Sequence, residues 1–107
     1  MGNMKIIYQI LKALDKSLDF EELNPDCISA DRLNVSYERW EQLLIMLYES
    51  GYIDGLIVTK GFADCKPHIT KPIQPRITLK GLEYLENNST MAKIEKAVKG
   101  IAEIVIQ

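Results

Sequence analysis

Three residues could hold a metal ion or carry out nucleophilic chemistry: Cys27, Cys65 and His68. Thiolate and imidazole are preferred zinc ligands, and Cys65 and His68 are separated by two residues, as in many metal-binding pairs. A structural zinc site needs four ligands, however, and the chain has no other cysteine or histidine. We therefore expect no metal site and two free thiols, with Cys27 as a small buried residue and Cys65 and His68 on a loop.

Catalysis is not expected either. A cysteine nucleophile needs an adjacent base, and His68 stands in a segment rich in proline and glycine, which does not build a rigid, enclosed site. Carboxylate pairs such as Glu38 and Glu41 could do acid–base work, but no Gly-rich phosphate loop accompanies them. We interpret these acids as solvated helix faces, and predict a non-catalytic protein without a cofactor.

Charge is distributed unevenly along the chain, although the net charge is only −2. Residues 15–54 are strongly acidic, whereas residues 55–80 carry five basic side chains and Asp64 as their one acid. Local basic stretches of this kind are typical of nucleic-acid contacts. The residues that could contact DNA are Arg39, Gln42, Lys60, Lys66, His68, Lys71, Arg76 and Lys80. The alternative is that the lysines keep a hairpin soluble.

Hydrophobic spacing predicts where the first elements lie. Apolar residues recur every three or four positions over residues 4–18, which indicates a helix with one buried face. Residues 19–25 break that period, and Pro25 disfavours helical geometry just before it, so a loop follows. We expect residues 27–28 to form a short strand.

A helix-turn-helix is predicted next. Ser29 can cap a single turn, Ala30–Leu33, and Asn34 or Ser36 then begins a second helix that runs through Glu49. Its apolar face comprises Trp40, Leu43, Leu44 and Leu47. We expect this face to pack against Ile7, Leu11, Leu14 and Leu82. The opposite, solvent-facing side comprises Glu38, Glu41, Gln42 and Glu49.

A β-hairpin and two further helices complete the expected order. Gly51 closes the second motif helix, residues 52–58 are rich in β-formers, and residues 60–75 contain three prolines that indicate a long, irregular tip. Residues 76–79 form the return strand, and Thr78 caps a short helix that ends at residues 87–88. Residues 1–88 would make one domain and residues 89–107 a C-terminal helix.

The C-terminal helix carries a short heptad seam: Met91, Ile94, Val98, Ile101 and Val105. This seam must be buried, either on the first helix or in a homodimer. Two heptads are too few for a stable isolated coiled coil, so dimerisation would need help from exposed Ile45, Met46 or Ile104. We favour the dimer.

Two passages resemble winged-helix proteins. Residues 77–85 (ITLKGLEYL) are similar to the passage in which the last strand hands over to a helix, with Thr78 as cap and Gly81 close to the sheet. Residues 47–53 (LYESGYI) resemble the exit from the second motif helix. Over nearly its whole length the chain is similar to the YjcQ-like family of small proteins from Gram-positive bacteria and their phages. The resemblance implies an α+β winged helix-turn-helix and supplies no functional residue.

Two functions remain open. A winged helix implies a DNA-binding or regulatory accessory protein, yet Glu38, Glu41 and Glu49 on the recognition face would repel phosphates. That repulsion favours the alternative, a protein-interaction module that kept the fold. The longest apolar run, residues 43–48, is far too short to cross a bilayer, and the N-terminus lacks a signal-peptide pattern. We therefore expect no membrane partner and a cytoplasmic location.

Overall fold

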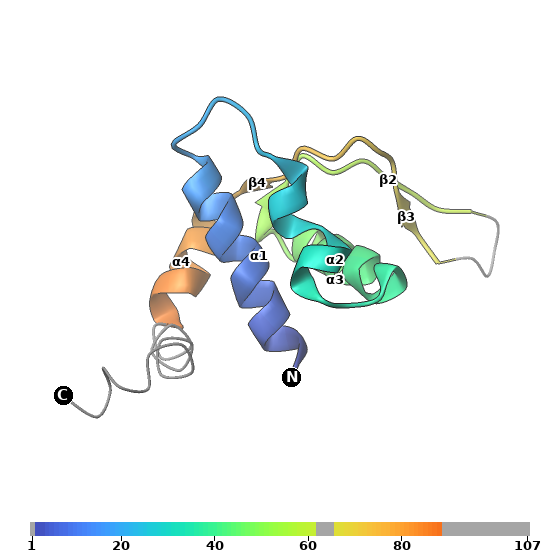
Figure 1. Cartoon of the computed structure of the whole chain (residues 1–107), viewed down its shortest axis with the longest axis horizontal. Helices are drawn as coiled ribbons and strands as arrows, with labels where there is room; N and C mark the ends of the chain where they lie inside the picture. The colour runs from blue at the N-terminus through green and yellow to red at the C-terminus, as the bar shows by residue number, and fades with distance from the viewer. Residues whose placement is uncertain (1, 62–65, 89–107) are drawn as a thin grey trace.

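Helices make up most of the fold, and a long β-hairpin projects from them (Figure 1). The computed structural model describes residues 2–61 and 66–88. The elements are α1 Asn3–Ser17, η1 Pro25–Ile28, α2 Ala30–Leu33, α3 Tyr37–Glu49, β1 Ile53–Asp54, β2 Val58–Thr59, β3 His68–Ile69, β4 Arg76–Ile77 and α4 Leu79–Asn87. This α+β order is compatible with a winged-helix-like fold. The expected C-terminal helix and its seam lie outside the described residues.

Side-chain caps begin three of the helices, as predicted. The hydroxyl oxygens of Ser29, Ser36 and Thr78 accept hydrogen bonds from backbone N–H groups three residues later, at 3.1, 3.2 and 3.1 Å. Each bond satisfies one of the amide donors that a helix N-terminus leaves without an intrahelical partner. The short helix α2 starts where the sequence places it, and α3 begins after Ser36, one of the two caps that the sequence offers, because Asn34 closes α2.

The strand expected at residues 27–28 is wrong, because these residues belong to the 3₁₀ helix η1. The Asn24 side chain accepts a hydrogen bond from the Asp26 N–H, and Pro25 stands in the first turn, where its fixed φ suits a helix. Cys27 is exposed, which corrects the expectation of a buried thiol. Ile28 provides the buried side chain of this turn.

The hairpin, residues 53–77, consists of two short antiparallel ladders in series. β1 pairs with β4 next to the helices, and β2 pairs with β3 farther out. Gly55 lies in the connection from β1 to β2 and has a φ of 86°, in the left-handed region that favours glycine. The expected irregular tip is therefore too long, because His68–Ile69 forms the strand β3. The sequence does not predict β3, because Pro67 and Pro72 stand close to its two ends and proline is rare inside strands.

A polar junction joins the end of α3 to the start of α4. The Thr78 hydroxyl donates to the Gly51 carbonyl at 2.6 Å, and the Lys80 ammonium donates to the Ser50 carbonyl at 2.9 Å. Gly51 has a φ of 85°, as expected for a residue that closes a helix. A Cβ at Gly81 would collide with the Tyr52 carbonyl, so this glycine allows the close approach of α4 that the sequence predicts.

The hydrophobic core lies where α1, α3 and the hairpin meet. Its predicted members from α3 are buried, as are Leu11 and Leu14 of α1. Ile7 and Leu82 pack at its edge and are partly buried. Ile45 was expected to be exposed, but only 2% of it is accessible, so it is not available for a dimer contact. The Trp40 indole N–H donates to the Ile28 carbonyl at 2.6 Å and thereby joins α3 to η1.

Trp40→Ala should lower the free energy of unfolding by about 3–5 kcal/mol, because it removes a buried ring and leaves a cavity. Trp40→Phe keeps part of the ring volume but removes the donor to Ile28, so it should cost less than the alanine variant while losing both packing and the hydrogen bond. Urea unfolding followed by circular dichroism measures both variants. An alanine variant as stable as the wild type would contradict the core assignment.

Candidate functional site

The eight predicted DNA contacts do not form one surface. Gln42 and His68 connect the hairpin to α3, and Lys80 belongs to the junction between α3 and α4. Arg76, on β4, lies near the C-terminal end of α1. The remaining four are Arg39, Lys60, Lys66 and Lys71.

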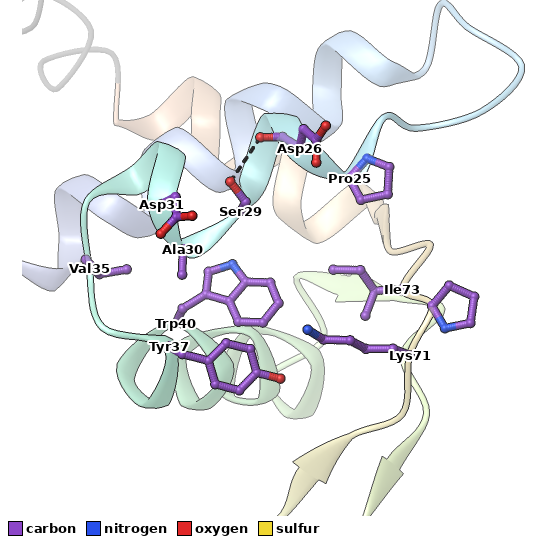
Figure 2. A pocket seen from close by; sticks show the side chains of 11 residues that line it. Pro25, Asp26, Ser29, Ala30, Asp31, Val35, Tyr37, Trp40, Lys71 and Ile73 are labelled. Atoms are coloured by element: carbon purple, nitrogen blue, oxygen red, sulfur yellow. Dashed lines mark hydrogen bonds between the residues drawn. The ribbon is translucent and has the colours of Figure 1, made fainter.

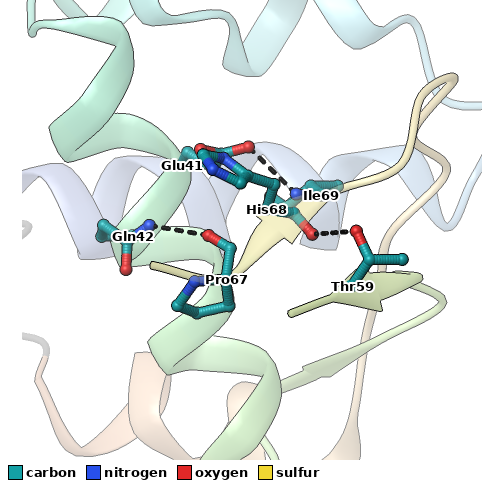
Figure 3. Close-up of polar contacts among 6 residues, drawn as sticks. All are labelled: Glu41, Gln42, Thr59, Pro67, His68 and Ile69. Atoms are coloured by element: carbon teal, nitrogen blue, oxygen red, sulfur yellow. Dashed lines mark hydrogen bonds and ion pairs between the residues drawn. The ribbon is translucent and has the colours of Figure 1, made fainter. Parts of the chain in front are cut away.

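A buried carboxylate holds the hairpin against α3 (Figure 3). One oxygen of Glu41 accepts the Ile69 N–H at 2.9 Å, and the other lies 3.0 Å from Nδ1 of His68. Glu41 is 4% exposed, whereas the His68 side chain is 63% exposed. The carboxylate is therefore anchored mainly by a buried backbone donor, with the imidazole at the solvent edge.

The pKa of the Glu41 carboxyl reflects opposed effects. Burial by itself raises it, but hydrogen bonds from the Ile69 amide and from His68, together with the charges of His68 and Lys71, lower it more. The net pKa lies below the ordinary value. Glu41 is thus an ionised structural group, which corrects the expectation that it belongs to a solvated face.

One further hydrogen bond joins the hairpin to α3, and another lies within the hairpin between β2 and β3 (Figure 3). The Gln42 amide donates to the Pro67 carbonyl at 3.1 Å, and the Thr59 hydroxyl donates to the His68 carbonyl at 3.4 Å. Because its amide group is engaged with the hairpin backbone, Gln42 is poorly placed to read a base edge.

A pocket of about 400 Å³ lies between α3, the η1–α2 segment and the hairpin (Figure 2). The Lys71 ammonium lies 4.7 Å from the centre of the Tyr37 ring and 5.7 Å from that of Trp40. These cation–π contacts tie the hairpin to the N-terminal turn of α3. Asp26 and Asp31 also line the pocket. Lys71 therefore has a structural partner, which reduces its availability to phosphate.

A second depression runs along the exposed side of α3 and is the region that brings predicted contacts together. We call it the α3 groove; it has a volume of about 680 Å³. Its lining is Asn3, Met4, Ile7, Ser36, Glu38, Arg39, Gln42, Leu43, Met46 and Lys66. The Arg39 guanidinium donates to the Asn3 side chain at 3.0 Å, so α1 helps to position it. Arg39 and Lys66 are both exposed and contribute the groove's positive charge.

The sequence reasoning missed a different basic pocket, on the opposite side of α1. Lys12 and Lys16 of α1 line it together with Arg32 of α2 and the exposed Cys27, around a volume of about 380 Å³. The signal was present, because lysines four residues apart share one face of a helix. Only the fold could add Arg32 to them.

The described part of the chain contains neither a cluster of metal-ligating side chains nor a helix that could span a membrane. Within residues 2–61 and 66–88, no three His, Cys, Asp or Glu side chains are grouped to hold a metal ion. No helix among these residues is long and apolar enough to cross a bilayer. Cys65, part of the cysteine and histidine set considered from the sequence, lies outside the described residues.

Glu41→Gln should lower the free energy of unfolding by about 1 kcal/mol at pH 7, because a neutral acceptor replaces a charged one. The pKa of Glu41 is lower in the folded protein than the ordinary value of 4.5. Its contribution is therefore complete above pH 4.5 and is lost as the pH falls through the folded-state pKa. Denaturant unfolding of both proteins across this range should show the deficit disappearing.

His68→Ala is the control for that comparison. Its side chain is largely exposed, so its loss should cost at most about 1 kcal/mol at neutral pH. A Glu41→Gln deficit that did not change between pH 7 and pH 3 would contradict the role given to the ionised carboxylate.

Comparison with known proteins identifies the family. A family model described as "YjcQ protein" matches residues 8–104. The chain is 31% identical over 103 residues to "Uncharacterized protein YjcQ" of Bacillus subtilis (strain 168), covering 96% of this chain and 97% of the relative. No solved structure matches the chain. The resemblance to the YjcQ-like family is thus confirmed: the chain belongs to the YjcQ family.

Proposed function

We propose that this protein is a non-catalytic DNA-binding protein that contacts duplex phosphates through Arg39, Lys60 and Lys66. The observation that carries the proposal is the convergence of Arg39 and Lys66 on the α3 groove. Lys60 is exposed just after β2, on the same projecting hairpin. Guanidinium and ammonium groups presented by a helix and an adjacent hairpin are the groups that contact a phosphate backbone in many DNA-binding proteins.

The position of Glu41 removes part of the electrostatic objection to DNA. The carboxylate is buried and faces the hairpin, so it does not add to the negative charge of the groove. Glu38 remains there, opposed by Arg39 and Lys66. The N-terminal end of α3, which carries the positive end of the helix dipole, adds to the attraction for phosphate.

Phosphate contacts, rather than base contacts, would dominate this complex. Gln42 is engaged with Pro67, and Arg39 is the one basic residue of α3. With few groups for base edges, we expect weak sequence preference and dissociation constants of about 10⁻⁴–10⁻⁶ M at physiological salt. A role without catalysis is supported by the separate places of Cys27 and His68, because Cys27 lines the pocket between α1 and α2 whereas His68 contacts Glu41 of α3.

A protein partner is the second candidate function. It is favoured by the apolar content of the α3 groove, where Met4 is 51% exposed and Met46 is 55% exposed. Flexible methionine side chains are common at surfaces that adapt to protein partners. A homodimer is one form that such a partner would take.

Duplex binding measured over a range of salt concentrations tests the DNA proposal. Three neutralised phosphates should give a slope of log affinity against log salt of roughly −3, at about −0.9 per phosphate. The double variant Lys60→Glu/Lys66→Glu should remove about two-thirds of that slope and leave folding unchanged, because both side chains are exposed.

Lys12→Glu/Lys16→Glu is the matched control, with the same change in charge on the other basic surface. It should leave the salt slope near its wild-type value. A loss of slope in this variant alone would move the DNA surface to α1 and contradict the proposed contacts. No binding by the wild type even at low salt would refute DNA binding altogether.

A further inference from the structure

An apolar hollow lies where α1, α3 and α4 meet. Its lining is Met4, Ile7, Leu11, Met46, Leu47, Ser50, Tyr52 and Tyr84, around a volume of about 130 Å³. Met4 and Met46 are more than half exposed, and the hollow adjoins the α3 groove through these two residues and Ile7. Removing exposed apolar surface of this kind from water lowers the free energy, so a segment that covers it would be stabilised.

Tyr84 adds a polar observation to the same place. Its ring meets Tyr52 edge to face, with centroids 5.6 Å apart, and its hydroxyl is buried without a hydrogen-bond partner among the described residues. Burial, followed by the influence of Tyr52, raises the pKa of the Tyr84 hydroxyl, so this group stays protonated and remains a donor. Buried hydroxyls are normally paired, so among residues 2–61 and 66–88 the hollow lacks a polar partner as well as an apolar cover.

The chain itself supplies a segment of suitable chemistry beside the hollow. Tyr84 stands in the last turn of α4, which ends at Asn87, and the apolar seam begins four residues later at Met91. Residues 91–105 would span about 22 Å as a helix, at 1.5 Å per residue. The helix α1, which forms one wall of the hollow, has the same number of residues.

We propose that residues 91–105 of the same chain cover this hollow, with the seam of Met91, Ile94, Val98, Ile101 and Val105 packed on Met4, Ile7 and Met46. The short connection to α4 favours the chain's own segment over a second copy. A tethered segment acts at an effective concentration in the millimolar range, whereas a second copy must lose translational and rotational freedom. Arg39 and Lys66 do not line the hollow, but Met4, Ile7 and Met46 line both depressions, so the covering segment would lie beside the proposed phosphate contacts. The test below does not use DNA, so its outcome is independent of the DNA proposal.

Methyl NMR of the full chain tests the proposal, because methionines stand on both sides of the expected contact. With ¹³C-methyl methionine, nuclear Overhauser effects should connect the Met91 methyl group to that of Met4 or Met46. Val98→Ser/Ile101→Ser should change the chemical shifts of the Met4 and Met46 methyls. The control Lys93→Ser/Lys96→Ser introduces two serines away from the seam, so it should leave the Met4 and Met46 methyl shifts unchanged.

The unmutated chain keeps the test decisive even if the seam variant unfolds, since the Overhauser effects need no substitution. Their absence in the wild type would overturn the proposal, as would equal shifts in the seam variant and its control. A sample that mixes labelled and unlabelled chains distinguishes contacts within one chain from contacts between chains, and sedimentation over a dilution series gives the oligomeric state. Together they show whether the chain's own segment or a second copy covers the hollow. Contacts that persist in a monomer support the chain's own segment, whereas contacts that arise between chains and vanish on dilution overturn it in favour of a dimer.

Discussion

The position of the hairpin depends on one constraint, the need of the buried Glu41 carboxylate for partners. A charge removed from water is strongly destabilising unless hydrogen bonds and opposite charges compensate for it. Glu41 stands on the side of α3 that β3 covers, and the Ile69 N–H and the His68 imidazole provide that compensation. The same contact satisfies a backbone donor of β3, a two-residue strand that also pairs with β2. This polar contact adds direction to the apolar packing that the helix and the hairpin already share.

The surface of α3 follows from this contact. With Glu41 and Ile45 buried and the amide of Gln42 engaged, the exposed side of the helix narrows to a strip that includes Arg39 and Met46. Lys71 is drawn onto Tyr37 and Trp40 at the N-terminal turn, so it stabilises the hairpin instead of extending a basic surface. The hairpin therefore determines both which charges face solvent and how much of α3 a partner could reach.

Membership of the YjcQ family places the chain among relatives without deciding what its surfaces bind. The two sides of α1 differ in a way that is relevant to that question. One side contributes Met4 and Ile7 to apolar depressions next to α3, and the other contributes Lys12 and Lys16 to a basic pocket next to α2. Met4 and Ile7 share the α3 groove with Arg39 and Lys66, so a phosphate backbone and an apolar segment would both meet the protein on that side of α1.

The sequence by itself determined the elements whose signals are local. Side-chain caps at Ser29, Ser36 and Thr78, the closing Gly51 and the apolar periodicity of α1 and α3 act within a few residues, so they could be read without coordinates. Only the tertiary structure decided that Glu41 is buried, because its burial depends on a strand 28 residues away in sequence. It likewise added Arg32 to the lysines of α1 and divided the eight candidate contacts among several surfaces. Helix periodicity tells which side chains share a face, whereas the packing of distant segments decides whether that face meets water or protein.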